Sequence, residues 1–423
     1  MSIFNSKVGN GVHDDTEYIQ SLLDSGKRCV HLPEPSVKYI ISKPLKIHSN
    51  TSLVLDRFTE IMLAPQSNCF MLQNADYENG NENISIEGGI WNYNDQNQRP
   101  NPLVTKEYKA VDLKTRRFHE STKYSDEYLG VPMRFYKTKN LTLKSFTIKD
   151  PITFAIQMGF VEYFTIDDIT FDFDLGNPVA ANTDGVHIDG GCAFGHITNL
   201  KGTTYDDLVA INADDFLSAP ISNITVDGIY TENCHSAVRL LSVVSPVKNI
   251  SISNLYGTCF QYVIGITKHF INEGSVGTFS NIVLKNIAVS KCIKDPVTKR
   301  VDRLFPVIYV QSEVSIDCLS IENLSRWEYV NPVETIGICE DAHIGALSIR
   351  DSVQKNCLDN ENYTLGKGYA RDVNSIPERN KDNNIIPFIV NNGTIDSLEL
   401  SNIKAEGEML LNYGQINKIT GLD

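Results

Sequence analysis

The feature that most constrains the fold of this 423-residue chain is a short strand pattern that recurs along it. Each copy alternates apolar and polar residues, or nearly so, which is the period of a half-buried β-strand. Most copies begin with Asn and run into a second β-rich stretch. Neighbouring copies begin 24, 26 and 32 residues apart (140 to 164, 223 to 249, 249 to 281). The copies start at Asn83, Asn140, Phe164, Asn223, Asn249 and Asn281.

Self-similarity at this interval indicates a solenoid. No helical period separates the copies, which argues against βαβ units and favours the stacked coils of a parallel β-helix. Asn at the same turn of successive coils can hydrogen-bond to its neighbours as a ladder. The sequence therefore predicts an all-β fold, a single-stranded right-handed parallel β-helix that forms one domain over residues 1–423.

Three segments depart from the repeat. Residues 15–25 carry apolar residues at helical spacing, followed by Gly26, and predict a short helix that caps the first coil within an N-terminal cap region, 1–30. Residues 99–131 are polar and charged, and we expect either a loop that walls a binding groove or a solvated insertion. Residues 353–386 are rich in Asn, Asp, Lys and Gly and predict a solvated insertion.

Composition narrows the possible partners. The net charge of −14 argues against nucleic acid and anionic membranes, which bind broad basic surfaces. No run of eighteen apolar residues is present, so no membrane span is expected. Nine cysteines without CxxC spacing favour reduced thiols over a disulfide framework or a zinc site. The first residues lack an apolar signal region, so we expect a cytoplasmic protein, or a secreted or periplasmic one if a leader has been removed.

Carboxylates concentrate between positions 182 and 215. Asp184 and Asp206 are 22 residues apart, close to one coil, and neighbouring coils are about 5 Å apart. Carboxylates this close repel when ionised, so one tends to keep its proton. A protonated acid beside an ionised base is what glycoside hydrolysis requires. Asp206 and Asp207 would point to opposite faces of a regular strand, so we predict a turn or bulge there.

A purely structural explanation is that acidic residues at turns accept hydrogen bonds from backbone N–H groups. It explains one Asp per turn, but explains poorly three acids on neighbouring coils, so a functional role is favoured. Asn182-Thr-Asp-Gly, followed one coil later by Tyr205-Asp-Asp-Leu-Val-Ala-Ile-Asn212, resembles the signature of glycoside hydrolase family 28, the polygalacturonases and rhamnogalacturonases. The opening Val8-Gly-Asn-Gly-Val-His-Asp-Asp-Thr16 also resembles the start of pectinase-like β-helices, members of the pectate-lyase-like superfamily.

The resemblance implies a role for each acid. Asp206 would protonate the leaving oxygen, while Asp184 and Asp207 would activate the attacking water. The anomeric carbon would be inverted, and no metal or other cofactor would be needed.

Later positions depart from the family pattern, which continues with Gly-His-Gly and then Arg-Ile-Lys. Cys234-His235-Ser236 keeps the histidine, and Ile266-Thr267-Lys268 keeps only the lysine. His235 is therefore a candidate catalytic residue. Arg239, on the same strand face as His235, could replace the lost arginine or form a structural ion pair with Asp214 or Asp215. The candidate substrate-binding residues are Asn182, Arg239, Lys268, Asp214 and Asp215.

We therefore expect an inverting, polygalacturonase-like glycoside hydrolase that acts on a pectic or other uronate-containing poly- or oligosaccharide. One alternative is a polysaccharide lyase or uronate epimerase on the same fold, in which the acids could bind Ca²⁺. Another is a carbohydrate-binding β-helix without catalytic activity. The sequence leaves open the sugar, the linkage, endo or exo action and the oligomeric state.

Overall fold

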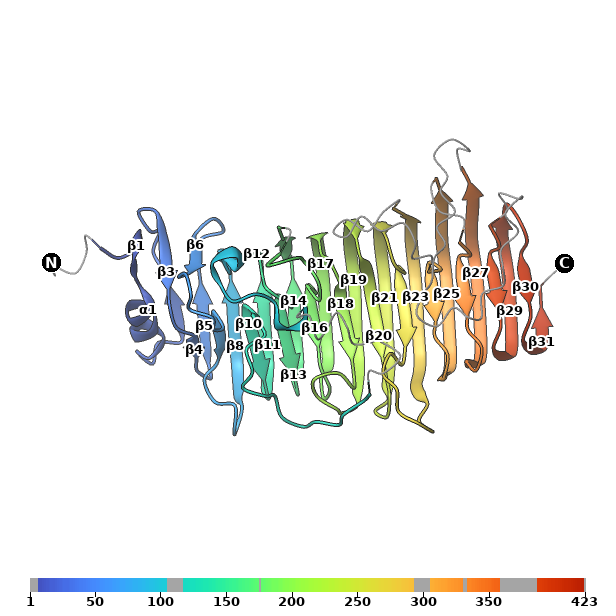
Figure 1. Ribbon diagram of the computed structural model, residues 1–423, viewed down its shortest axis with the longest axis horizontal. Coiled ribbons are helices and arrows are strands. Elements are labelled where there is room, and N and C mark those ends of the chain that lie inside the picture. Colours follow the sequence, from blue (N-terminus) through green and yellow to red (C-terminus); the bar gives the residue numbers. More distant parts are fainter. Residues whose placement is uncertain are drawn as a thin grey trace.

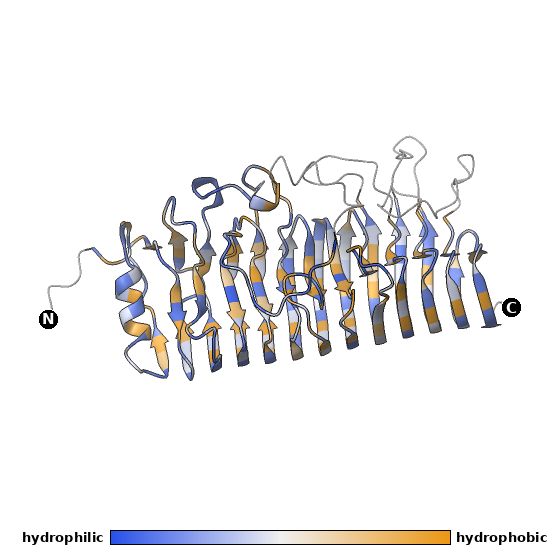
Figure 2. Cartoon of the chain, turned by 60° about the horizontal axis from the view of Figure 1, so that its bottom comes forward, coloured by the Kyte–Doolittle hydropathy of each residue, from blue (hydrophilic) through white to orange (hydrophobic). Residues whose placement is uncertain are grey.

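The computed structural model shows a parallel β-helix whose coils stack along one long axis (Figure 1), and the predicted right-handed parallel β-helix is confirmed. It describes residues 7–104, 117–174, 176–292, 305–329, 333–357 and 386–421. Neighbouring coils pair in parallel, as β19 (Ile221–Cys234) does with β21 (Val247–Cys259). Figure 2 shows apolar and polar residues alternating along these strands, as expected when one face is buried.

One sheet of 12 short strands runs the length of the solenoid and carries the features described below. Its central strands pair in the order β10–β13–β16–β18–β20–β22. The strands are β4 (Leu45–Ile47), β7 (Leu72–Asn74), β10 (Met133–Tyr136), β13 (Ile156–Gly159), β16 (Val186–Ile188), β18 (Asp207–Asn212), β20 (Ser236–Leu241), β22 (Ile264–Thr267), β24 (Ile308–Val310), β26 (Ile336–Ile338), β28 (Ile389–Asn391) and β30 (Leu410–Asn412).

A second sheet of 19 strands closes the rest of each coil. Besides β19 and β21 it contains β1 (Asn10–Asp14), β2 (Cys29–His31), β3 (Lys38–Ile41), β5 (Thr51–Val54), β6 (Glu60–Leu63), β8 (Asn81–Glu87), β9 (Ile90–Asn92), β11 (Thr138–Lys144), β12 (Thr147–Lys149), β14 (Glu162–Asp167), β15 (Thr170–Asp172), β17 (Ala193–Thr203), β23 (Gly277–Lys291), β25 (Val314–Glu328), β27 (His343–Asn356), β29 (Thr394–Ala405) and β31 (Gln415–Thr420).

Helical structure is sparse in the described residues. The predicted amphipathic helix is present as α1 (Thr16–Leu23) at the N-terminal end of the solenoid (Figure 1), where Ile19 and Leu23 are buried in the core. Two short 3-10 helices, Asp95–Asn97 and Pro102–Val104, interrupt the coils further on. No helix in the described part of the chain is long and apolar enough to cross a membrane.

The predicted asparagine ladder is present on two stretches of the solenoid. Asn140 Nδ2 donates to Asn83 Oδ1 at 2.8 Å, and Asn249 Nδ2 donates to Asn223 Oδ1 at 2.9 Å. The ladder residues have positive φ, near 55–59°, a conformation that Asn tolerates well. Between the two stretches the same turn holds Tyr163 and Phe194, which are stacked with ring centroids 4.9 Å apart.

Of the two predicted excursions, the first contains a segment that packs against the coils. Over residues 117–131, Phe118 N–H donates to Ile271 O, the Ser121 carbonyl accepts from Ser218 N–H, and Tyr136 donates to Thr122 O. This segment therefore crosses the ends of several strands of the 12-stranded sheet, which argues against a solvated insertion there. The second begins later than predicted, because β27 continues to Asn356, and 358–385 lie outside the described residues.

Candidate active site

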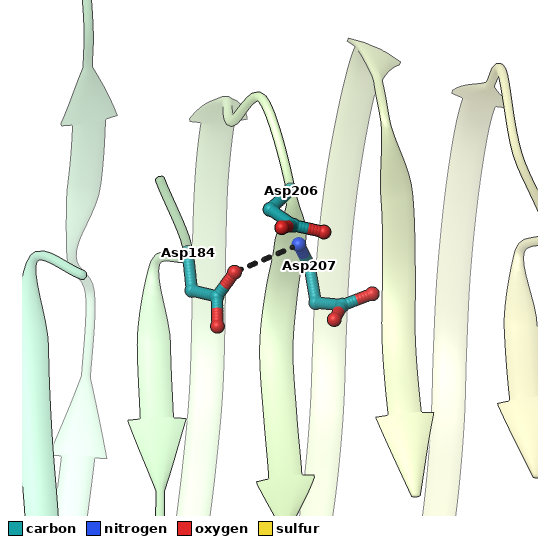
Figure 3. Close-up of side chains that lie close together, drawn as sticks. All are labelled: Asp184, Asp206 and Asp207. Atoms are coloured by element: carbon teal, nitrogen blue, oxygen red, sulfur yellow. Dashed lines mark hydrogen bonds between the residues drawn. The ribbon is translucent and has the colours of Figure 1, made fainter. Parts of the chain in front are cut away.

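The carboxylate cluster of Asp184, Asp206 and Asp207 lies where two neighbouring strands of the 12-stranded sheet begin (Figure 3). Val186 of β16 pairs with Val209 of β18, and the same register places Asp184 opposite Asp207. Asp207 N–H donates to Asp184 Oδ1 at 3.1 Å. One carboxylate oxygen from each of the three acids lies within 4.8 Å of the other two, so the predicted one-coil approach occurs.

Local backbone geometry makes this approach possible. The chain bends at Tyr205 and Asp206, and β18 begins only at Asp207, so the two adjacent acids reach the same region. The predicted turn is therefore present. Gly185 lets the coils come together after Asp184, because an added Cβ would lie 2.5 Å from Leu208 O.

The three acids differ in burial. Asp184 and Asp207 are fully buried, whereas Asp206 is partly exposed. Asn182, predicted to bind substrate, lies beside Asp206 and donates from Nδ2 to its Oδ2 at 3.4 Å. Asp206 is thus the cluster member that a bound ligand can contact directly.

Asp207 is balanced by a cation from the next coil. Its Oδ2 lies 2.9 Å from Arg239 Nε, although the N–H is not aligned as a hydrogen bond, and its Oδ1 accepts from Ser236 Oγ and from Tyr262 OH. Burial raises the pKa of Asp207, while Arg239 opposes that rise. Arg239, which we predicted to bind substrate or to pair with Asp214 or Asp215, instead pairs with Asp207.

Asp184 is balanced by His187, a residue that the sequence analysis missed. His187 Nδ1 lies 2.6 Å from Asp184 Oδ2, and its Nε2 lies 3.2 Å from Asp189 Oδ1. Burial raises the pKa of Asp184 to about 7, and the neighbouring Asp206 adds to the rise, whereas the hydrogen bond from His187 lowers it. The signal in the sequence is the run Val186-His-Ile-Asp189, in which two polar residues interrupt a buried strand.

His235 lies on the coil that follows Asp206, as predicted. It directly precedes β20, its N–H donates to Thr204 O, and its ring nitrogen Nε2 hydrogen-bonds with Gln261. The adjacent Ser236 N–H donates to Asp206 O at 3.4 Å. The structure therefore brings His235 to the edge of the carboxylate cluster.

Lys268 and Asp214 lie elsewhere, which corrects their predicted substrate-binding roles. Lys268 follows β22, about 20 Å along the strand direction from the Asp207–Ser236 register pair. Its Nζ is buried and donates to Asn272 O, Ser275 O and Glu313 Oε2 at 2.8–3.0 Å. Asp214 is buried at the same strand ends, and its Oδ2 accepts from three backbone N–H groups, of Val243, Val244 and Ser245.

Asp215 is the remaining candidate. Its Oδ2 accepts from Asn212 Nδ2 at 3.1 Å and lies 3.8 Å from His187 Nε2. Asp215 therefore faces the imidazole beneath the cluster, as a third carboxylate around that ring.

The fold and the cluster define a class: a parallel β-helix with grouped carboxylates at the start of adjacent short strands. Residues 118–302, 185 of the 423, match the model of the glycosyl hydrolases family 28, which confirms the predicted resemblance over the part that carries the cluster. No curated protein matches the sequence.

Solved structures share the architecture. The family 28 exopolygalacturonase of Yersinia enterocolitica is 12% identical, with a TM-score of 0.50 over 98% of this chain and 76% of that one. The tailspike protein of E. coli bacteriophage HK620, in complex with a pentasaccharide, is 10% identical, with a TM-score of 0.53 over 94% and 68%. At these identities the likeness shows the fold alone.

Proposed function

We propose that the protein is a glycoside hydrolase that cleaves glycosidic bonds at the Asp184–Asp206–Asp207 cluster. The observation that carries the proposal is the convergence of three carboxylates from two coils within 4.8 Å, inside the segment that matches family 28. The pentasaccharide bound by the tailspike, a protein of the same fold, supports a saccharide ligand for this chain too.

The charge balance supports a division of roles. Asp184 and Asp207 each have a cationic partner, His187 and Arg239, which favours the ionised form that a base requires. Asp206 has no such cation among the described residues and is the partly exposed member. We assign Asp206 as the acid that protonates the leaving oxygen, and Asp184 and Asp207 as the carboxylates that activate water.

The distance between the carboxylates bears on whether the configuration at the anomeric carbon is inverted or retained. Inverting enzymes usually separate their carboxyl groups by about 6.5–9.5 Å so that a water fits between them. Here one oxygen of each acid lies within 4.8 Å of one oxygen of the other two, which is closer than that range and nearer to the spacing of about 5–5.5 Å in retaining enzymes. We propose inversion on the resemblance to family 28, with Asp184 or Asp207 as the base, and the spacing makes retention the alternative outcome. ¹H NMR of the first product anomer tests this, and a retained configuration would instead assign one acid as a nucleophile.

For the substrate we propose an acidic glycan, recognised by Arg134 rather than by Lys268. Arg134 of β10 lies two coils, or about 10 Å, from His187 in one register row through Gln157. Its guanidinium lies between the rings of Phe70 and Tyr124, 4.3 and 4.6 Å from their centroids, and Nε donates to Gln157. Arg134 is 3% exposed and neither Nη has a protein acceptor among the described residues, so we propose that this guanidinium pairs with a carboxylate of the bound glycan.

A cation-dependent lyase is the second candidate, because the same oxygens could hold a divalent ion. Two of the three carboxylates already face a protein cation, which would compete with a metal ion. Loss of activity with a chelator, together with unsaturated products, would favour the lyase.

Product analysis on pectic and other polysaccharides tests the proposal. Wild type should generate saturated reducing ends, and Asp206→Asn should lower the rate by about 10²–10⁴. Asp317→Asn is the matched control, because Asp317 is exposed on the 19-stranded sheet and accepts only from Ser280 Oγ among the described residues. Binding of the glycan by both wild type and Asp206→Asn, without any product, would identify a carbohydrate-binding protein.

A further inference from the structure

The imidazole of His187 lies between carboxylates at both of its nitrogens. Nδ1 is 2.6 Å from Asp184 and Nε2 is 3.2 Å from Asp189, with Asp215 at 3.8 Å from Nε2. An ionised carboxylate only accepts hydrogen bonds. Both ring nitrogens must therefore carry protons when Asp184 and Asp189 are ionised, which makes the ring an imidazolium.

The ring is fixed as well as charged. His187 is fully buried, and its face is stacked on Phe154 with centroids 3.8 Å apart at 22°. Phe216 contacts the ring edge-on, with centroids 5.8 Å apart. The two aromatic contacts and full burial hold the imidazole between the two carboxylates.

Asp189 is anchored independently of His187. Its Oδ2 accepts from Tyr124 OH and from Gln157 Nε2, both at 2.9 Å, and its Oδ1 also accepts from Phe216 N–H at 3.2 Å. Asp189 is therefore a fixed, buried counter-charge on the side of the ring away from the carboxylate cluster. Gln157 links it onward to the guanidinium of Arg134.

From this geometry we propose that His187 is a positioning residue: a permanently protonated imidazolium that orients the Asp184 carboxylate and allows it to ionise beside Asp206 and Asp207. The part that His187 plays in hydrolysis rests on the proposed function of the protein. His187 itself is assigned no contact with substrate, because the ring is enclosed by Asp184, Asp189, Asp215 and the two phenylalanines.

The electrostatic environment agrees with this role. Burial alone would lower the pKa of His187, but Asp189 and the hydrogen bond to Asp184 outweigh burial and raise it to about 10. The charged groups that face the ring are Asp184 from its own coil, Asp189 at the end of its strand and Asp215 from the next coil. With a neutral residue at 187, Asp184 would lose its cationic partner, so its pKa would rise above about 7.

Histidine-labelled NMR tests the charge directly. At pH 8, one imidazole should show two protonated nitrogens, and this signal should vanish in His187→Gln. His343→Gln is the matched control, because His343 is exposed and pairs with Asp396 on the other sheet. A singly protonated His187 ring at pH 8 would overturn the proposal. Asp189→Asn should weaken the double protonation, which provides a second test if His187→Gln fails to fold.

The effect on Asp184 is measured in the same proteins. The ¹³C carboxyl signal assigned with Asp184→Asn should titrate at a midpoint about one pH unit or more higher in His187→Gln than in wild type. The acid limb of the kcat/KM profile should move by the same amount, whereas a purely structural role would lower activity without moving that limb. An unchanged Asp184 midpoint would refute the positioning role. If no glycan is cleaved but both NMR results appear, the hydrolase proposal fails and the electrostatic one stands.

Discussion

Arg239 is the cation that balances the buried carboxylate of Asp207, and Arg239→Met removes that charge while keeping much of the volume. Asp207 is fully buried and the Arg239 side chain is 12% exposed, so solvent replaces little of the lost interaction. Breaking a buried ion pair by removing one partner costs about 3–5 kcal/mol. An unfolding entropy of about 2.1 cal/mol/K per residue over 423 residues converts this cost to a fall of about 4 °C in Tm.

The loss should depend on pH. Without Arg239, the folded-state pKa of Asp207 rises further above its unfolded value, because the largest influence opposing burial is lost and only smaller ones, such as the hydrogen bond from Ser236, remain. The unfolded chain then binds fewer protons than the folded chain above pH 4, so stability falls as pH rises, by up to about 1.4 kcal/mol per pH unit. Thermal unfolding at pH 5 and pH 8 should show a larger deficit at pH 8.

A second substitution isolates the cause. Asp207→Asn in the Arg239→Met background removes the buried charge, so it should recover stability at pH 8 and abolish the pH dependence. An equal deficit at both pH values, or a double variant no more stable than Arg239→Met, would refute the reasoning that an unpaired Asp207 carboxylate is responsible.

Three further substitutions test contacts elsewhere in the molecule. Lys268→Met should lower Tm, because the buried ammonium group and its three hydrogen bonds are lost, while KM for the glycan stays within about twofold of wild type. Arg134→Gln should raise KM for a uronate-containing glycan about tenfold or more and leave KM for a neutral analogue unchanged, as steady-state kinetics on both would show. Tyr163→Asn with Phe194→Asn should continue the asparagine ladder and relieve positive φ at two bulky residues, raising stability by about 1 kcal/mol in thermal unfolding.

The coil repeat and the acidic cluster could be predicted because both depend on local spacing. The ladder Asn residues share one backbone conformation with positive φ. A bend before Asp207 could be predicted because adjacent residues of a regular strand point to opposite faces, so Asp206 and Asp207 can approach Asp184 together only outside the strand. The predicted position of Lys268 was wrong because it assumed a longer coil than the one that the structure has. The strands β20 and β22 are offset by 26 residues (Val238 opposite Ile264), so a residue 33 positions after His235 overshoots its row and falls beyond the strand.

The role of His187 could not be predicted, because its environment is assembled from separate parts of the chain. Asp184 and Asp189 flank it in sequence, but Phe154 precedes β13, and Phe216 and Asp215 follow β18. A histidine in a strand is usually a neutral core or surface residue. Phe154, Phe216 and Asp215 from the neighbouring coils bury the ring and hold it between the two flanking carboxylates, and these tertiary contacts are not visible in the strand pattern.

The three acids of the cluster differ in whether a cationic side chain lies beside them and in which coil supplies it. Asp184 takes its cation from its own coil and Asp207 takes one from the following coil, while Asp206, between them at the bend, has none among the described residues. Three neighbouring carboxylates with equal surroundings would share protons without fixed roles. Because two of them are buried beside cations while the third is partly exposed, the three acids are not equivalent. The proposed roles follow this difference: the acid that protonates the leaving oxygen is the member of the cluster that a ligand can contact.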